Sequence, residues 1–367
     1  FEHPIYNLDT IEVQKKMYLI QGYLNTYYCG SYCGFGFHED GIQSAAYIAE
    51  ILNISLPWIR NENFENRLYE ISSSKDSYLN DISQYLIKAG GKRFRPVCTL
   101  LSGELGNGNN EKIIDAAVAV ELIHLGSLYH DDVIDDAETR RSVESANVKW
   151  NATLSILAGD YLLARSSELA AETLGLESVK LLASTYAELV EGQTKEVQYQ
   201  YDTEHSTDDY MKVIEGKTAS LIRTSAKLGA MAADCDEKTT EAISKWAWHS
   251  GLIFQITDDI LDLSSNTEAL GKEAGKDILE GTYTLPVLIA LSENKEKIKE
   301  ILEDIKNSKI ELSNVIDEFN NEKIIRESKK YLDHHFKKGM QSLDGIQDSK
   351  IKKILIDISN YLINRSN

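Results

Sequence analysis

The apolar residues of this chain follow a helical spacing over most of its length. From about residue 65 to the end they recur every three or four positions, as in "AAVAVELIHLGSLY" (116–129). Residues at these spacings lie on one face of an α-helix. Proline, which interrupts helices, occurs only 4 times in 367 residues. The pattern predicts an all-α body, and 42% hydrophobic residues suffice for a large core in one domain or two.

Three regions of different composition follow one another along the chain. Residues 1–58 are rich in Tyr and Gly, and "LPWIRNENFEN" (56–66) has the character of a linker. A helical body with the charged motifs extends from about 65 to 290, and charged amphipathic segments fill 291–367. We therefore expect an appendage over residues 1–58 and a helical domain over 59–367, with the C-terminal segments as a packing layer.

The charge of the chain limits its partners. A formal net charge of −19 disfavours nucleic acid and anionic membrane surfaces. No uninterrupted apolar run reaches about 18 residues and no secretory signal is visible, so we expect a soluble, cytoplasmic protein without a membrane span. The 4 cysteines match neither a zinc site nor a dense disulfide framework, and we expect reduced thiols.

Two runs of aspartates, "HDDVIDD" and "TDDILD", share the spacing D-D-x-x-D. Four positions apart on a helix, Asp131 lies above Asp135, and Asp258 lies above Asp262. Carboxylates about 6 Å apart repel by roughly 3 kcal/mol at an effective dielectric constant near 20. Each run follows an apolar stretch, so a cation site explains the two runs better than two acidic surface patches.

Basic residues that could hold anions accompany the carboxylates. "AGGKRFRP" (89–96) places Lys92 and Arg95 after a glycine pair, whose bare backbone can approach an anion closely. The other basic elements are Arg93, the pair Arg140 and Arg141, Lys217 with Thr218, Lys272 and Lys276. Each alone is typical of a surface salt bridge, but with the carboxylates they describe a site for two anionic groups. One would be held through Mg²⁺ and the other by Arg and Lys donors.

The chain resembles the trans-prenyl diphosphate synthases from about residue 65 to 365. "GGKRFRP", "HDDVIDDAETRRS", "GKTA", "FQITDDILD" and "GKEAGKD" occur in that family's order and at its spacing. The resemblance implies an all-α isoprenoid-synthase bundle around a central cavity, with the two aspartate motifs facing each other across its mouth. It also implies head-to-tail (1'-4) condensation of isopentenyl diphosphate with an allylic diphosphate. The absence of a G-x-x-x-x-G-K-[ST] loop agrees with diphosphate as a leaving group.

The resemblance implies metal ligands among the aspartates. Asp131, Asp135 and Asp258 would ligate Mg²⁺, as a cluster of three ions. Asp132, Asp259 and Asp262 would support them, as further ligands or by holding the ligands in place.

The resemblance also implies substrate contacts. Arg140, Lys217 and Lys272 would contact the allylic diphosphate. Thr218 and Gln255 would turn oxygen dipoles toward the carbocation that remains when diphosphate departs. The residues that would hold isopentenyl diphosphate are Gly91, Lys92, Arg95, His124 and Arg141. His124 could equally be a core histidine, and the chain departs from the family at Ser142, where glycine is usual.

Product length is expected to depend on the helix that leads into Asp131. A growing chain would descend past Ser127 and Gly126, one turn before Asp131, and past Ile123, two turns before it. Short-chain members of the family carry aromatic side chains at the first turn, whereas these residues are small. The resemblance implies a product of about six to eight isoprene units, with a farnesyl or geranylgeranyl synthase as the alternative. Alternatively, Gly126 merely permits close packing of two helices.

Residues 3–58 resemble the C-terminal end of a flavin-dependent amine-oxidase-like protein. The resemblance rests on "YCGSYCGFGFHEDGIQSA", with "HPIYNLDTIEVQKK" before it and "LPW" after it. The G-x-G-x-x-G fingerprint that would open a dinucleotide-binding domain is absent, and a flavin site cannot be built from this segment alone. We therefore expect an appendage that binds no flavin.

Two further interpretations compete with a chain-elongating synthase. A terpene cyclase shares the helical fold and one aspartate-rich motif, but would lack the second motif and "GGKRFRP". A regulatory subunit of a heteromeric synthase typically loses one aspartate motif, whereas both are complete here. For the assembly, the resemblance implies a homodimer.

Overall fold

The computed structural model describes residues 62–107, 110–141, 143–264 and 274–364. The chain forms two compact units, residues 1–65 and residues 66–367, and nearly all described residues belong to the second. The predicted appendage over residues 1–58 lies outside the described residues, and so does Lys272.

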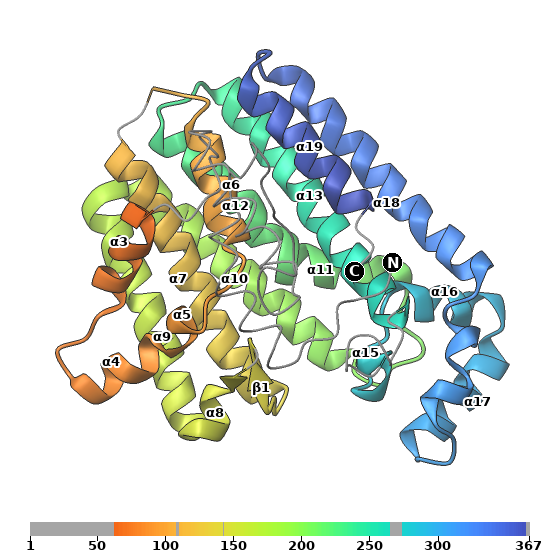
Figure 1. Cartoon of the computed structure of the whole chain (residues 1–367). Coiled ribbons are helices and arrows are strands. Elements are labelled where there is room, and N and C mark those ends of the chain that lie inside the picture. Colours follow the sequence, from red (N-terminus) through yellow and green to blue (C-terminus); the bar gives the residue numbers. More distant parts are fainter. Residues whose placement is uncertain (1–61, 108–109, 142, 265–273, 365–367) are drawn as a thin grey trace, which may run out of the picture. The chain divides into compact units, whose positions relative to one another are not determined.

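The described residues are almost entirely helical, which confirms the predicted all-α body (Figure 1). The α-helices are α3 (Glu62–Ser72), α4 (Ser77–Ser83), α5 (Tyr85–Lys88), α6 (Phe94–Gly103), α7 (Asn110–Ile134), α8 (Ala146–Lys149), α9 (Ala152–Leu169), α10 (Leu176–Gln198), α11 (Thr207–Ile214), α12 (Ser220–Ala232), α13 (Glu237–Ser264), α15 (Lys276–Leu279), α16 (Leu285–Glu293), α17 (Lys295–Lys306), α18 (Glu322–Ser342) and α19 (Lys350–Asn364). Short helical turns are η4 (Ala170–Leu174), η5 (Glu215–Ala219), η6 (Leu312–Asn314), η7 (Ile316–Glu318) and η8 (Leu343–Gly345).

Two long helices, α7 and α13, organise the bundle (Figure 1). α7 packs against α6, α9 and α12, and α13 packs against α12, α18 and α19. Val118, Val120, Leu122 and Leu125 of α7 are fully buried although they point to different sides of the helix. A helix that is apolar on all sides needs neighbours all round. Each aspartate motif lies at the C-terminal end of one of these two helices.

The segment Glu111–Ile134 of α7 has the length and apolar composition of a membrane-crossing helix, alone among the described residues. In the bundle, 78% of its most apolar 18-residue window is buried. Core helices of globular proteins pass the same test of length and composition. The burial of this segment is that of a core helix.

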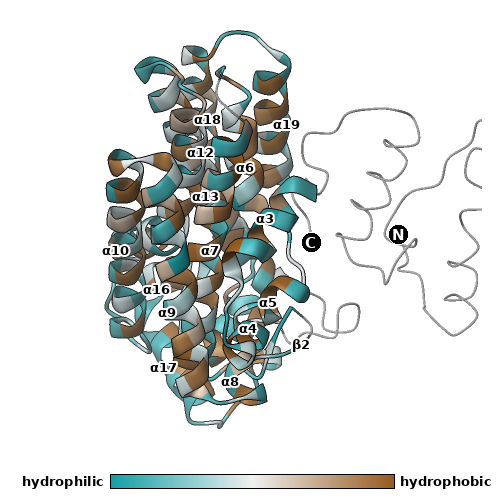
Figure 2. Ribbon diagram, turned by 90° about the vertical axis from the view of Figure 1, so that its left-hand side faces the viewer, coloured by the Kyte–Doolittle hydropathy of each residue, from teal (hydrophilic) through white to brown (hydrophobic). Residues whose placement is uncertain are grey.

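The charged C-terminal segments form amphipathic helices that pack on the bundle, as predicted. α18 lies along α13 and also contacts α16 and α19. Its buried residues Ile324, Ser328 and Leu332 recur every four positions and so share one face. Figure 2 shows hydrophobic and hydrophilic residues interspersed along the helices.

A short hairpin follows α7, which the apolar pattern did not predict. β1 (Thr139–Arg140) pairs antiparallel with β2 (Val143–Glu144), and Arg140 lies opposite Val143. The Tyr85 hydroxyl donates a hydrogen bond to the Glu144 carbonyl at 3.0 Å, which ties the hairpin to α5. Arg140, on the first strand of the hairpin, lies beside Asp132 of the first aspartate motif.

Candidate active site

Asp131 and Asp135 stack one turn apart at the end of α7, as predicted. The backbone N–H of Asp135 donates to the Asp131 carbonyl at 2.8 Å. Burial raises the pKa of Asp131 to about 6; Lys217 opposes this shift, and the Asp135 carboxylate adds to it. Burial also raises the pKa of Asp135. Neither carboxylate therefore has enough positive charge nearby to hold its pKa at the ordinary value.

Asp132, between these two residues, is fully buried and holds Arg140. The Nε and Nη2 atoms of Arg140 lie 2.7 and 2.6 Å from Asp132 Oδ1. Charge-assisted bonds of this kind fix a guanidinium in place. Asp132 Oδ2 is buried without a hydrogen-bond partner among the described residues. Two roles were predicted for Asp132, ligand or support, and this geometry favours support.

The second motif, on α13, is tied into a chain of hydrogen bonds. The Thr218 hydroxyl donates to Gln255 Oε1 at 2.8 Å, and Gln255 Nε2 donates to Asp259 Oδ1 at 2.8 Å. The Tyr210 hydroxyl donates to Asp259 Oδ2 at 2.5 Å. Burial raises the pKa of Asp259 to about 6, although both hydrogen bonds lower it. Asp259 thus positions Gln255 and Thr218, the two residues predicted to face the carbocation.

Asp258 and Asp262 occupy the exposed side of this turn, and both are half-buried. The backbone N–H groups of Lys276 and Asp277 hydrogen-bond to the Asp262 carboxylate. The Gly275 N–H donates to the Asp262 carbonyl at 2.9 Å. Gly275 has a φ of +74°, in the left-handed region that favours glycine. This turn folds the last residues of "GKEAGKD" back onto the second aspartate motif.

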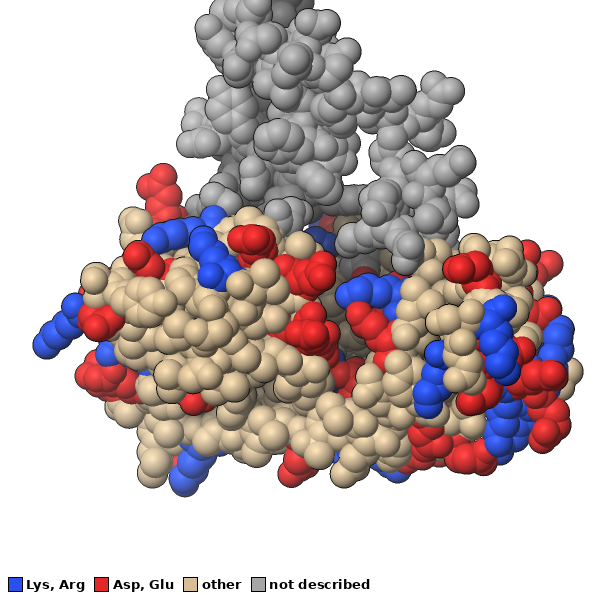
Figure 3. All heavy atoms as spheres, turned by 90° about the horizontal axis from the view of Figure 1, so that it is seen from below, with Lys and Arg blue, Asp and Glu red and all other residues tan. Residues whose placement is uncertain are grey.

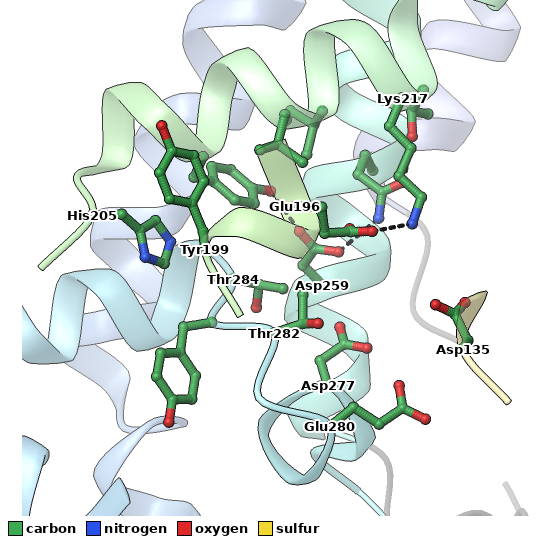
Figure 4. A pocket seen from close by; sticks show the side chains of 16 residues that line it. Asp135, Glu196, Tyr199, His205, Lys217, Asp259, Asp277, Glu280, Thr282 and Thr284 are labelled. Atoms are coloured by element: carbon green, nitrogen blue, oxygen red, sulfur yellow. Dashed lines mark hydrogen bonds and ion pairs between the residues drawn. The ribbon is translucent and has the colours of Figure 1, made fainter. Parts of the chain in front are cut away.

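One pocket joins the two aspartate motifs (Figure 4). It is lined by Asp135 from the first motif, by Gln255 and Asp259 from the second, and by Lys217 and Thr218 from η5. The structure thus brings these predicted site residues together. Figure 3 shows charged side chains of both signs around the hollow at the centre of the face seen from below.

Three carboxylates without a role assigned from the sequence also line this pocket: Glu196, Asp277 and Glu280 (Figure 4). Burial, together with the charges of Asp259 and Asp262, raises the pKa of Asp277 to about 8. Asp277 stands within "GKEAGKD", so the sequence did carry a signal for it. Glu196 carries none, because the crossing of α10 and η5 brings it to the pocket, and Glu280 lies just outside the quoted motifs, directly after α15.

Lys217 lies on the π-helical turn η5, a form of helix that is frequent at functional sites. A Cβ at Gly192 of α10 would lie 2.4 Å from the Lys217 backbone nitrogen, so this close crossing requires glycine. Glu196, one turn after Gly192, forms an ion pair with Lys217 Nζ. Burial lowers the pKa of Lys217, but Glu196 and the neighbouring carboxylates outweigh it and raise the pKa overall. Lys217 is therefore a permanent cation in the pocket.

The residues around the pocket fit a divalent cation. The raised pKa values of Asp131, Asp259 and Asp277 reflect buried negative charge that a cation would relieve. Mg²⁺ and Ca²⁺ both prefer oxygen ligands, and Mg²⁺ is commonly held by one or two carboxylates with substrate phosphates. Among the described residues, no three Asp, Glu, His or Cys side chains are close enough to hold a metal ion by themselves. Substrate and water oxygens would therefore complete the coordination.

A second cluster, at the start of α6 and on α7, contains Arg95 and His124. Arg95 Nη1 lies 3.3 Å from His124 Nε2. Because a guanidinium can only donate, Nε2 accepts and the imidazole proton is on Nδ1. Burial, with the charges of four surrounding arginines, lowers the pKa of His124 well below its usual value. His124 is therefore neutral, while Lys92 is exposed on the neighbouring loop.

Arg141 links this cluster to the loop 89–93, called here the glycine loop. Its Nη1 donates to the Leu86 carbonyl at 2.6 Å and to the Gly90 carbonyl. Gly91 has a φ of +139°, and a Cβ there would lie 2.7 Å from Arg141 Cζ. The guanidinium thus occupies the space that a side chain at position 91 would need. The loop and Arg141 form one unit, as a shared binding site requires.

Gly126 packs against α9. A Cβ at Gly126 would lie 3.0 Å from the Gly159 carbonyl oxygen and 3.0 Å from Leu163 Cγ. These contacts support the alternative that Gly126 permits close packing of two helices. Ser127 is buried and its hydroxyl donates to the His124 carbonyl at 2.9 Å, and Ile123 is buried as well. The influence of Ile123 and Ser127 on product length stays a prediction.

Comparison with known proteins identifies the family. Residues 76–321 match polyprenyl synthetase. The chain is 37% identical over 298 residues to heptaprenyl diphosphate synthase component 2 of Geobacillus stearothermophilus. This alignment covers 81% of this chain and 93% of that protein. It is 44% identical over 220 residues to nonaprenyl diphosphate synthase of Mycobacterium tuberculosis. That alignment covers 60% of this chain and 65% of that protein.

The fold is shared with solved structures of this group. The crystal structure of polyprenyl synthase from Caulobacter crescentus, complexed with calcium and isoprenyl diphosphate, has a TM-score of 0.77 and 28% sequence identity. The similarity covers 88% of this chain and 97% of that one. Heptaprenyl diphosphate synthase from Staphylococcus aureus also has a TM-score of 0.77, with 30% identity, covering 83% of this chain and 97% of that one. This chain belongs to the polyprenyl synthetase family.

Proposed function

We propose that the enzyme condenses isopentenyl diphosphate head-to-tail with an allylic diphosphate to make an all-trans polyprenyl diphosphate. The observation that carries the proposal is the pairing of two anion sites. The carboxylate pocket around Lys217 suits a diphosphate bound through divalent cations. The cluster of Arg95, His124 and Arg141 suits a diphosphate bound directly.

The chemistry uses these residues without a protein nucleophile. When the allylic C–O bond breaks, Arg140 and Lys217 would stabilise the departing diphosphate as its charge develops. Mg²⁺, held by Asp131, Asp135 and Asp258 as three ions, would supply further neutralisation of that diphosphate. Thr218 and Gln255 would face the carbocation that remains. The isopentenyl double bond then forms the new C–C bond, and the released diphosphate accepts the proton that is lost.

We propose a product of about six to eight isoprene units, within the range that this helical scaffold can flank. Two relatives support a long product, since they are named heptaprenyl and nonaprenyl diphosphate synthases. A geranylgeranyl product is the alternative, because similar solved structures include geranylgeranyl pyrophosphate synthases.

We also propose that the enzyme is a homodimer that pairs through α9 and α10. Apolar side chains on these two helices are exposed, namely Ile156, Leu157, Leu176, Val190 and Val197 (helices labelled in Figure 2). Exposed apolar patches mark interaction surfaces. A different subunit is the alternative partner, because one relative is named as a component of its synthase. Sedimentation of the purified chain distinguishes the two.

The function is tested by diphosphate release from isopentenyl and farnesyl diphosphates, followed by chromatography of the dephosphorylated products. Release should require Mg²⁺ and stop with chelator. Asp131→Ala and Asp258→Ala should each lose several orders of magnitude in turnover, because a metal site supplies several kcal/mol of transition-state stabilisation. Asp333→Ala, an exposed control on α18, should leave turnover unchanged. Full activity in either site variant, or no elongated product, would contradict the proposal.

A further inference from the structure

A buried carboxylate that the proposed chemistry does not use lies next to the basic cluster. Glu121 of α7 is 1% exposed and precedes His124 by about one turn. Arg93 Nη1 lies 3.0 Å from Glu121 Oε1. Glu121 Oε2 is buried without a hydrogen-bond partner among the described residues. A buried charge destabilises a protein unless it is paired, so a structural or functional role for this carboxylate is expected.

Arg93 connects Glu121 to the glycine loop. Its Nη1 donates to the Gly90 carbonyl at 3.2 Å and its Nη2 to the Ile87 carbonyl at 3.4 Å. Arg93 itself has a φ of +50°, in the left-handed region that residues other than glycine rarely adopt. Such a conformation persists only where surrounding contacts hold it. The ion pair with Glu121 is one of those contacts.

The same contacts reach the arginines of the isopentenyl diphosphate site. The Gly90 carbonyl that accepts from Arg93 also accepts from Arg141. Electrostatic attraction to Glu121 acts on Arg93, Arg141 and Arg95 together. The carboxylate offsets the mutual repulsion of these three positive charges, and the effect is large because Coulomb interactions are strong away from solvent.

We propose that Glu121 and Arg93 are positioning residues of the isopentenyl diphosphate site. They hold the loop 89–93 and, through it, Arg95 and Arg141 in the geometry that receives the diphosphate. Neither residue itself contacts the substrate. The inference rests on the proposed function. Neither residue has a role in the chemistry described for that function.

Charge alone and positioning predict opposite effects for Glu121→Gln. If the carboxylate were only a nearby negative charge, its removal would strengthen binding of an anionic substrate and lower the KM for isopentenyl diphosphate. If it positions the arginines, its removal should raise that KM. The sign of the change therefore separates the two explanations.

Steady-state kinetics with both substrates provide the test. Glu121→Gln and Arg93→Gln should each raise the KM for isopentenyl diphosphate about tenfold, with the KM for farnesyl diphosphate unchanged within about twofold. Glu121→Asp should recover part of the loss. Should Glu121→Gln not fold, Arg93→Lys keeps the charge but loses the forked contacts, and should show the same rise.

Asp115→Asn is the matched control. Asp115 is also a buried carboxylate on α7, about 9 Å along the helix, and its Oδ1 lies 2.8 Å from Arg67 Nε. Its loss should lower thermal stability and leave both KM values unchanged. An unchanged or lower KM for isopentenyl diphosphate in Glu121→Gln and Arg93→Gln would overturn the inference, and so would an equal rise in Asp115→Asn. A wild-type enzyme that releases no diphosphate from isopentenyl and farnesyl diphosphates together would instead refute the proposed function.

Discussion

The second aspartate of each D-D-x-x-D motif, Asp132 or Asp259, is buried and holds a neighbour in place. Asp132 holds Arg140, and Asp259 holds Gln255. Successive helix positions point about 100° apart, so the second aspartate of each motif points away from the first and the last, which share one face of the helix. Residues that look equivalent in the sequence therefore differ in burial and in hydrogen-bond partners.

Arg140 and Arg141 should differ kinetically although they are neighbours in the sequence. Arg140 lies beside the first aspartate motif, whereas Arg141 binds the glycine loop. We expect Arg140→Ala to raise mainly the KM for the allylic substrate, and Arg141→Ala mainly that for isopentenyl diphosphate. A charge-assisted contact contributes roughly 1.5–3 kcal/mol, about ten- to a hundred-fold in affinity. Initial rates over a grid of both substrates measure this, and equal effects of both variants on both KM values would refute the division.

At the scale of elements, the crossing of α7 and α9 depends on Gly126. A Cβ at this position meets the Gly159 carbonyl and Leu163 at 3.0 Å. We expect Gly126→Ala to lower the free energy of unfolding by about 1–3 kcal/mol, because packed interiors tolerate added volume poorly. Urea titration measures the loss. Ser127→Ala is the control, because the Ser127 hydroxyl donates to the His124 carbonyl of its own helix.

The same contact determines what a larger residue at position 126 should do. Gly126→Tyr would push α9 away before its ring could block a product channel, so it should unfold the bundle or weaken it severely. A folded Gly126→Tyr enzyme with shortened products would show that the position faces the product after all. Chromatography of the products and a melting curve on the same sample decide the matter.

The contact between α13 and α18 contains a pair of histidines that should weaken the fold in acid. His249 Nδ1 and His335 Nδ1 lie 3.1 Å apart. Burial, with charges from neighbouring basic groups, lowers the pKa of each to about 4. In the unfolded chain a histidine titrates near about 6.5, so below that pH the unfolded state binds more protons than the folded state. Stability should therefore fall as the pH drops from about 6.5 toward 4.

The loss should be modest, because both rings are only partly buried. We expect the free energy of unfolding to fall by about 1–2 kcal/mol between pH 7 and pH 5. His335→Gln should flatten this dependence, whereas Lys337→Gln, exposed on the same helix, should leave it as it is. Urea titrations at several pH values measure the dependence of the free energy of unfolding on pH. The same dependence in the wild type and both variants would show that His335 does not cause it.

At the scale of the whole molecule, the motifs of the synthase all lie in one of the two units. The first quoted motif begins at Gly90, and the unit that contains it spans residues 66–367. We expect deletion of residues 1–58 to leave synthase turnover largely intact, and the full chain to show no flavin absorbance. Turnover and an absorbance spectrum measure both. A yellow protein, or a folded but inactive deletion variant, would show that the appendage has a role in this enzyme.

The sequence by itself determined the helical class and the stacking of the aspartates. Both follow from local spacing: apolar residues every three or four positions need a helix, and a four-residue interval aligns Asp131 with Asp135. The order of the charged motifs likewise pointed to the family before any fold was known. These properties depend on residues close in the chain, and a sequence displays them directly.

Only the tertiary structure decided which side chains meet across helices. Glu196 reaches Lys217 because glycine lets α10 approach η5, and Glu121 reaches Arg93 because α7 packs against α6, which begins directly after Arg93. The two interpretations of Gly126 stayed open in the sequence for the same reason, since its neighbour on α9 is set by how two helices cross. A crossing angle results from the packing of many side chains at once. No local spacing encodes it, so a one-dimensional pattern shows the residues of this site but not their partners.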